Sequence, residues 1–232
     1  VPVFDIIKTK LPITLQVNIF SLILTVPVGI ILGIIAALKK NTAADHIISI
    51  MVILFISVPS FVFAALLQYF FAFKWGWAPI LLSTEPTLTW TKFRSMILPI
   101  LSLSFGGIAT ITRYMRSELC EALNSEYMLL AKTKGLSQVQ ATVRHAIRNS
   151  FIPLANIIIP MFFSIMGGAM VIENIFGIPG LGQLSVSSIN ALDHPLTIAT
   201  LFFYSVIGLV SILVVDLSYG IIDSRIRIGG RK

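Results

Sequence analysis

Five stretches of the chain contain no Asp, Glu, Lys or Arg and are long enough to cross a lipid bilayer. A membrane-spanning helix needs about 20 apolar residues, and about 17 is the practical minimum. The stretches are Leu11–Leu38, Ile47–Phe73, Met96–Thr112, Ser150–Ile172 and Leu196–Val215. Pro27, Pro59 and Pro160 fall inside them, where a neighbouring helix or water must satisfy the carbonyl that each proline leaves free. The pattern predicts an all-α polytopic membrane protein whose five spans form a single transmembrane domain, residues 1–232.

The composition agrees with a membrane protein. Of the 232 residues 56% are hydrophobic and 12% are charged, whereas a soluble domain has about 25% charged residues. The formal charge of +7 does not indicate nucleic-acid binding, because the basic residues form no single patch with interleaved aromatic residues. One cysteine, Cys120, excludes an internal disulfide, and the three histidines lie too far apart along the chain to suggest a metal site.

The basic residues set the orientation. Twelve lie in one set of loops: Lys39, Lys40, Arg113, Arg116, Lys132, Lys134, Arg144, Arg148, Arg225, Arg227, Arg231 and Lys232. Five lie in the other set: Lys8, Lys10, Lys74, Lys92 and Arg94. The loops richer in Lys and Arg face the cytoplasm. We therefore expect Val1 outside the membrane, and the loop 113–149 and the tail 219–232 in the cytoplasm.

The loop 113–149 is the one long polar run, and its pattern predicts two short helices joined at a glycine. From Met115 onward, apolar residues recur at helical spacing: Leu119, Leu123, Leu130 and Ala131. Gly135 suits the left-handed conformation that ends a helix. Ser137 and Gln140 form a capping box for the second helix, which is expected to carry an apolar face of Val139, Val143, Ala146 and Ile147. A partner protein can push on a compact element of this kind.

The loop 176–195 on the outer side is rich in turn-forming residues, including Gly177, Pro179, Gly180 and Gly182. These predict a tight, irregular backbone at the outer membrane boundary, which is tolerated there only if it is buried in protein or lines a water-filled cavity. Glu173 and Asp193 then either touch a permeating solute or make ordinary polar contacts in the headgroup region. The sequence leaves both interpretations open.

Several function classes lack their motifs. The chain has no G-x-x-x-x-G-K-[ST] phosphate loop, so we expect no ATP hydrolysis and no cofactor in this chain alone. A stand-alone secondary carrier or channel predicts internal repeats and midplane charges, and neither is visible. An intramembrane enzyme needs a nucleophile and a base at matching depth, which Cys120 and the histidines do not offer.

Three blocks resemble one family. The first runs from Tyr127 to Gly135 and continues through Arg144–His145 and Arg148–Asn149 to Pro153. The second runs from Val171 to Gly182, followed by Asp193–Pro195, and the third is Asp223–Arg227. Together they resemble the membrane subunit of a bacterial ABC importer of the dipeptide/oligopeptide/nickel group, and within it the B-type peptide permease subunit.

The match has two departures. The general motif of the cytoplasmic loop begins Glu-Ala-Ala, but here Leu129 and Leu130 stand at the first two positions, and only Ala131 and Gly135 match. Full-length members have six spans, so we expect a further span upstream of the five.

The resemblance implies a type I ABC importer transmembrane domain in the bacterial plasma (inner) membrane. The expected partners are a second homologous permease subunit, two ABC ATPase subunits that carry ATP and Mg²⁺, and an extracytoplasmic peptide-binding protein. Nickel or another small solute remains the alternative to peptides. The ATPase-coupling residues it implies are Glu121, Glu126, Tyr127, Ala131, Lys132, Lys134, Gly135, Arg144 and His145, with Ala131 and Gly135 permitting close docking. The candidate pathway or outer-gate residues are Glu173, Asn174, Phe176, Pro179, Gly180 and Asp193.

Overall fold

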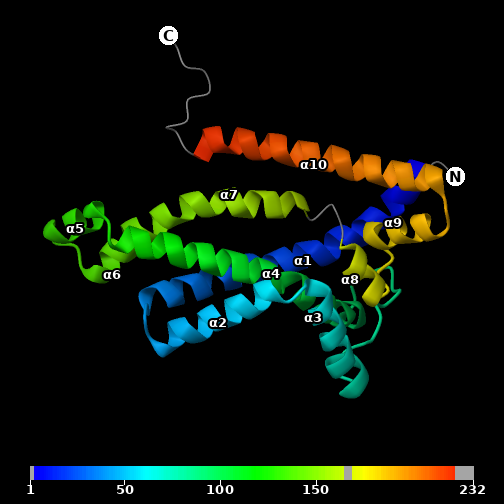
Figure 1. The fold of residues 1–232 in the computed structure, drawn as a ribbon, viewed down its shortest axis with the longest axis horizontal. Helices are drawn as coiled ribbons and strands as arrows, with labels where there is room; N and C mark the ends of the chain where they lie inside the picture. Colours follow the sequence, from blue (N-terminus) through cyan, green and yellow to red (C-terminus); the bar gives the residue numbers. More distant parts are fainter. Residues whose placement is uncertain (1–2, 165–168, 223–232) are drawn as a thin grey trace, which may run out of the picture.

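The structure, a computed structural model, describes residues 3–164 and 169–222, and this part of the chain is helical without any strand. Figure 1 shows long helices running side by side, with short helices at both ends. The elements are α1 (Val3–Leu38), α2 (Ala43–Ser57), α3 (Ser60–Leu67), the π-helix η1 (Gln68–Lys74), α4 (Trp90–Leu123), α5 (Glu126–Thr133), α6 (Gln138–Ala141), the π-helix η2 (Thr142–Ile147), α7 (Arg148–Ser164), α8 (Met170–Ile175), α9 (Leu181–Asn190) and α10 (His194–Ile222). The predicted all-α class is confirmed.

Among the described residues, three helices are long and apolar enough to cross a membrane: Val3–Leu38, Trp90–Leu123 and His194–Leu217. Each contains one of the predicted spans. A fourth arises if α2 and α3–η1 are taken together as one bent span. The helix α7, with 17 residues, is shorter than the other three, so by length and composition the described residues supply three or four of the five predicted spans.

The predicted span Ile47–Phe73 is not one continuous helix, because the helix axis bends by 100° between α2 and α3, at the proline that the sequence places inside the span. Val58 leaves the helix with extended backbone angles, φ −96° and ψ 124°. The cause is Pro59, whose ring disfavours the helical conformation in the preceding residue and which has no N–H for the helix ladder. Pro27 behaves differently and stays inside the continuous helix α1.

Parts of the predictions lie outside the described residues: residues 165–168 of the fourth span, the resemblance block 223–227, and both Val1 and Lys232. The orientation of the two ends therefore stays a prediction. The helix α10 continues to Ile222, so residues 219–222 of the predicted tail are helical.

The centre of the fold is the contact between α1 and α4. Three glycines bring the two backbones together: a Cβ at Gly33 would lie 2.6 Å from the Met115 Cβ, and one at Gly107 would lie 2.6 Å from the Thr25 Cγ2. A Cβ at Gly29 would lie 2.7 Å from the Cβ of Ile111. In a membrane, small residues favour helix association because lipid supplies no hydrophobic drive and close packing must supply the attraction.

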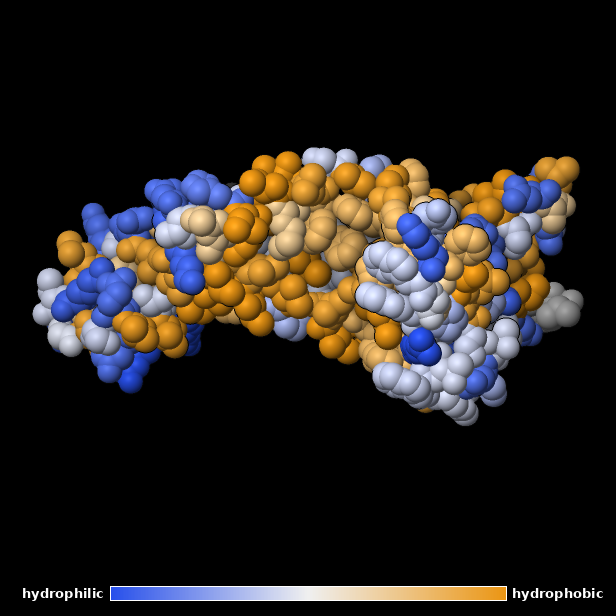
Figure 2. All heavy atoms as spheres, turned by 90° about the horizontal axis from the view of Figure 1, so that it is seen from below, coloured by the Kyte–Doolittle hydropathy of each residue, from blue (hydrophilic) through white to orange (hydrophobic). Residues whose placement is uncertain are grey.

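Two apolar clusters flank this contact. The outer cluster is built around Val17, Met96 and Phe176, and the inner cluster around Met115, Leu119 and residues of α5. Figure 2 shows hydrophobic residues over the middle of the elongated molecule and hydrophilic residues at both ends, with strongly hydrophilic ones gathered at the end that carries α5 and α6. The apolar middle and polar end are those of a membrane protein with a polar segment outside the bilayer.

We expect Gly33→Leu to lower the free energy of unfolding by about 1–3 kcal/mol, because the new side chain overlaps Met115 and the helices must separate. The matched control is Gly208→Leu on α10, since a Cβ at Gly208 meets nothing within 4 Å. Thermal unfolding of the purified protein measures both. Equal midpoints for the two variants would contradict the close α1–α4 packing.

Candidate functional site

The predicted coupling loop (113–149) begins differently from the expectation. A single helix from Met115 to Ala131 is wrong: α4 ends at Leu123 and α5 begins at Glu126. At the break, the Asn124 side-chain amide donates to the Cys120 carbonyl at 2.7 Å, and the Ser125 hydroxyl donates to the Ala122 carbonyl at 2.6 Å. Short polar side chains that bond to nearby backbone in this way compete with helix continuation.

The turn after α5 matches the prediction. Gly135 has φ +89°, the left-handed conformation that glycine adopts without the cost of a Cβ. The capping box is present as well: the Gln140 N–H donates to the Ser137 hydroxyl at 3.3 Å, and the Ser137 N–H donates to the Gln140 side-chain oxygen at 3.1 Å. Both local signals are therefore confirmed.

The predicted apolar face of the second helix is wrong. Val139 and Val143 are 72% and 58% exposed, whereas Ala146 is fully buried and Ile147 packs against the inner cluster. The helix changes at Thr142 from α6 into η2. Wider π-helical turns shift the angular position of every later side chain, so residues that share a face in a regular α-helix separate here.

The two sides of α5 have different surroundings. Met128 and Ala131 are buried against Leu119 and the rest of the inner cluster. Ala131 therefore contacts its own chain. On the other side Tyr127, Leu129 and Leu130 are exposed. Gly135 is exposed too, and a Cβ there would meet nothing within 4 Å.

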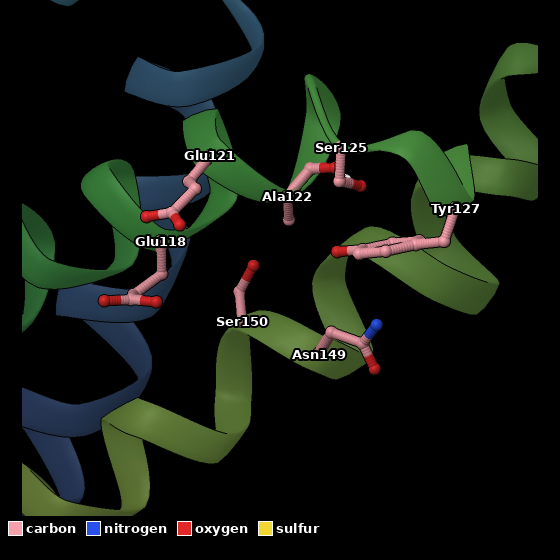
Figure 3. A pocket seen from close by; sticks show the side chains of 7 residues that line it. All are labelled: Glu118, Glu121, Ala122, Ser125, Tyr127, Asn149 and Ser150. Carbon is pink, nitrogen blue, oxygen red and sulfur yellow. Dashed lines mark hydrogen bonds between the residues drawn. The ribbon is translucent and has the colours of Figure 1, made fainter. Parts of the chain in front are cut away.

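Beside α5 lies a pocket of about 150 Å³. Figure 3 shows Glu118 and Glu121 on α4 facing it from one side, Tyr127 on α5 from another, and Asn149 and Ser150 at the start of α7. The structure thus brings together Glu121 and Tyr127 of the predicted coupling residues. The other charged ones are exposed and do not line this pocket: Glu126, Lys132, Lys134, Arg144 and His145.

Sequence reasoning missed a buried ion pair next to this loop. Asp45 is only 2% exposed, and the guanidinium of Arg116 on α4 donates two hydrogen bonds of 2.6 and 2.7 Å to its carboxylate. The Asn41 N–H donates to the same carboxylate at 2.9 Å, with Asn41 at φ +64°. The pair fixes the turn between α1 and α2 against α4. The sequence indicates this ion pair only through Asp45 itself, an acidic residue that follows Lys39 and Lys40 in a short polar stretch.

On the opposite end, Glu173 joins three separate segments. It is 3% exposed. Its carboxylate accepts hydrogen bonds from the Thr14 hydroxyl and the Gln183 N–H, both at 3.0 Å, while the Leu181 N–H donates to the Thr14 hydroxyl at 2.8 Å. The first turn of α9 is thereby capped by side chains from α1 and α8.

The glycines of this outer junction are explained by the carboxylate. A Cβ at Gly180 would lie 2.6 Å from the Glu173 Oε2, and one at Gly182 would lie 2.8 Å from the Met170 backbone. The expectation of irregular backbone over 176–195 is wrong for most of that loop, since Leu181–Asn190 is helix α9. Glu173 makes the ordinary polar contacts of one of the two interpretations, but its partners are protein groups, since its side chain is buried in the protein. A contact of Glu173 with the solute stays a prediction.

The remaining outer-gate candidates differ in exposure. Phe176 is buried in the outer cluster, and Pro179 is exposed. The exposed Asn174 donates its side-chain amide to the Met170 carbonyl. Asp193 is exposed and accepts from the Leu196 N–H at 3.1 Å, which caps the first turn of α10. Their role along a solute pathway stays a prediction.

The architecture is that of ABC transporter membrane subunits. A structure of the MetNI methionine ABC transporter in inward-facing conformations matches with a TM-score of 0.74 at 15% identity, covering 96% of this chain and 98% of that one. A structure of an amino acid ABC transporter with histidines matches with a TM-score of 0.68 at 16% identity, covering 92% of each chain. The predicted type I importer fold is confirmed by these neighbours.

The chain belongs to the family of binding-protein-dependent transport system inner membrane components, whose model matches residues 29–228. It is 40% identical to the dipeptide transport system permease protein DppB of Lactococcus lactis subsp. cremoris over 98% of this chain and 73% of that protein. It is 38% identical to DppB of Bacillus subtilis, over 97% and 70%. It is 34% identical to the oligopeptide transport system permease protein OppB of Haemophilus influenzae, over 96% and 71%. The protein is thus a multi-pass membrane permease of an importer, as the resemblance implied.

We expect Arg116→Ala to lower the free energy of unfolding by about 1–3 kcal/mol, because the Asp45 carboxylate loses its counter-ion and keeps the Asn41 N–H as a donor. Arg113→Ala is the matched control, since Arg113 lies on the same helix, is exposed and only stacks on Tyr114. It should change the stability by less than about 0.5 kcal/mol. Thermal unfolding compares the two variants, and the same loss from both would exclude a specific Asp45–Arg116 contribution.

We expect Glu173→Ala to destabilise the outer junction by about 1–3 kcal/mol, because the Gln183 N–H and the Thr14 hydroxyl lose their acceptor inside the protein. Hydrogen exchange of the amides in α9 should accelerate while exchange in α5 stays unchanged. Uptake by the assembled transporter should fall as well. Unaltered exchange in α9 together with normal uptake would show that the carboxylate does not hold the junction.

Proposed function

We propose that this chain is the membrane-spanning permease subunit of an ATP-driven peptide importer. It forms half of the translocation pathway for dipeptides or oligopeptides. The family membership and the peptide permeases among the relatives support this function. Because the relatives named above are all peptide permeases, peptides are preferred over nickel as the solute.

One observation carries the coupling part of the proposal: the segment Glu126–Ile147 has one side built into the inner cluster and another side that exposes apolar residues. Exposed valines and leucines on a polar loop are a cost in water. An ATPase subunit that covers Leu129, Leu130 and Val139 would remove that cost and would hold the segment at the same time.

The buried side of the segment gives a route for force. Met128 and Ala131 of α5 pack against Leu119 of α4, and α4 packs against α1 through Gly33 and Gly107. A push on α5 therefore acts on the central helix pair rather than on a free loop. ATP shifts the transporter between two states only if the ATPase contacts differ between those states. This segment is positioned to transmit that difference from the ATPase to the α1–α4 pair.

The proposal assigns ATP and Mg²⁺ to two partner ATPase subunits, with no cofactor on this chain. A second homologous permease subunit completes the pathway, and an extracytoplasmic peptide-binding protein delivers the solute. The excess of Lys and Arg in the loops around α5 supports a cytoplasmic position for this segment. The outer junction around Glu173 then faces the binding protein's side of the bacterial inner membrane.

We expect Gly135→Ile to abolish most peptide uptake and most solute-stimulated ATP hydrolysis of the assembled transporter. A β-branched residue at φ +89° is strained, and its side chain projects from a surface that meets no other part of this chain. The segment would therefore lose the shape that the ATPase groove requires.

The matched control is Gly76→Ile. Gly76 also has positive φ, +64°, and open space around its Cβ position, but it lies in the loop between η1 and α4, at the other end of the molecule. Both variants place a β-branched residue at a positive φ with open space around the Cβ position, so a loss of uptake in the Gly135 variant with normal assembly is attributed to the coupling role. Normal uptake by the Gly135→Ile protein would remove that role.

A further inference from the structure

The break between α2 and α3 exposes backbone that a continuous helix would enclose. Pro59 has no N–H, so it cannot donate to the carbonyl of Phe55 as the helix ladder requires. The new helix starts with the Val62 N–H donating to the Pro59 carbonyl at 2.9 Å. Ser57, Pro59 and Ser60 are all exposed.

This break lies at membrane depth. Gly106 and Thr110 of α4 line a pocket together with residues of the break. The position of Gly106 along α4 therefore gives the depth of the break in the membrane. At about 1.5 Å per residue, Gly106 lies about 18 Å along α4 from Arg94 and about 10 Å from Arg113. These two arginines bracket an apolar stretch close to the bilayer's hydrocarbon thickness of about 30 Å.

The pocket has a volume of about 340 Å³, within the range of ligand pockets. It is lined by Phe55, Ile56, Val58, Pro59, Ser60, Phe63, Gly106 and Thr110. Two of these rings belong to a packed aromatic trio: Phe105 lies 4.5 Å from Phe55 and 5.1 Å from Phe63, centroid to centroid. The trio joins α2, α3 and α4, so the wall of the pocket is preformed.

Gly106 keeps the pocket open. A Cβ there would meet nothing within 4 Å, in contrast to the neighbouring Gly107, which is needed for contact with Thr25. The Thr110 hydroxyl already donates to the Gly106 carbonyl at 2.9 Å. The side chains that line the pocket are therefore mostly apolar, and the hydroxyl groups among them are those of Ser60 at the break and Thr110 on α4.

Irregular backbone at this depth is tolerated only where protein covers it or where it lines a water-filled cavity. Lipid cannot satisfy the carbonyls that precede Pro59. A transported peptide can, because it carries N–H donors next to side chains of varied size. An aromatic wall beside the Phe55 carbonyl, to which Pro59 cannot donate, has the chemistry that such a solute needs.

We propose that this pocket is a solute-contact site in which an apolar side chain of the transported peptide packs against Phe55 and Phe63 while the backbone of the α2–α3 break meets the peptide's N–H groups. The proposal rests on the proposed peptide import. In it, the size of the pocket determines which peptide side chains fit. A larger residue at position 106 then excludes bulky side chains first.

The test is Gly106→Leu in the full transporter with its binding protein. The measurement is the ratio of initial uptake rates for a phenylalanine-containing peptide and for the corresponding alanine peptide. We expect that ratio to fall at least about tenfold, because filling an apolar pocket discriminates by about that factor per lost methylene contact. Gly208→Leu, at a glycine of α10 with equally open space, should leave the ratio unchanged.

A second variant keeps the test independent of folding. Ile56 lines the pocket and is 47% exposed, so Ile56→Ala enlarges the pocket without removing a core residue. The ratio should then move in the opposite direction, in favour of the larger peptide. Opposite shifts from the two variants support the proposal.

Two outcomes would overturn this proposal, and a third would refute the proposed function. Equal losses for both peptides, or an unchanged ratio in Gly106→Leu, exclude a size-sensing pocket. Loss of the second permease subunit from the purified Gly106→Leu complex identifies the face as a subunit contact instead. Failure of the wild-type transporter to take up either peptide refutes the proposed function itself, and is distinguished from these outcomes because the variants are not involved.

Discussion

Close contact between α1 and α4 is the constraint on which the rest of the structure depends. Gly29 and Gly33 admit the side chains of Ile111 and Met115, and Gly107 admits Thr25. A pair of serines follows the same seam, with the Ser21 and Ser104 hydroxyls 3.0 Å apart. Because lipid competes for every apolar surface, only tight packing and buried hydrogen bonds hold two such helices together. The inner and outer clusters are assembled on this pair of helices. The proposed coupling segment, Glu126–Ile147, and the outer junction around Glu173 are attached through these clusters.

Two buried carboxylates complete the frame at opposite ends. Asp45 fixes the α1–α2 turn to α4 through Arg116, and Glu173 fixes α9 to α1 through Thr14. A buried carboxylate without partners is costly, so each is surrounded by donors. Polar contacts therefore hold the two ends of the bundle. At the α2–α3 break between them, Pro59 has no N–H to donate to the Phe55 carbonyl. This contrast separates the parts that hold the fold from the part that is suited to meet a solute.

The coupling segment also has one side that holds the fold and another side that is free to meet a partner. Met128 and Ala131 anchor it to α4, and the exposed Leu129 and Leu130 remain for a partner. The two leucines stand where the general form of the motif has Glu-Ala, so the exposed side of α5 is apolar at these two positions. Tyr127 reaches into the acidic pocket beside Glu118 and Glu121 (Figure 3). The segment is thus held firmly on one side and is accessible on the other, as transmission of a push requires.

Features that depend on near neighbours could be predicted from the sequence: the apolar spans, the left-handed Gly135 and the capping box of Ser137 with Gln140. Each rests on the conformational preference of a few adjacent residues. The tertiary structure alone decided that Ala131 faces inward, that α9 is a helix, and that the helix bends at Pro59 by 100°. It also decided the partners of Glu173 and Asp45, which are separated by 159 and 71 positions from Thr14 and Arg116. Local pattern carries no information about contacts at such separations, because they follow from how whole helices pack and not from the residues beside them.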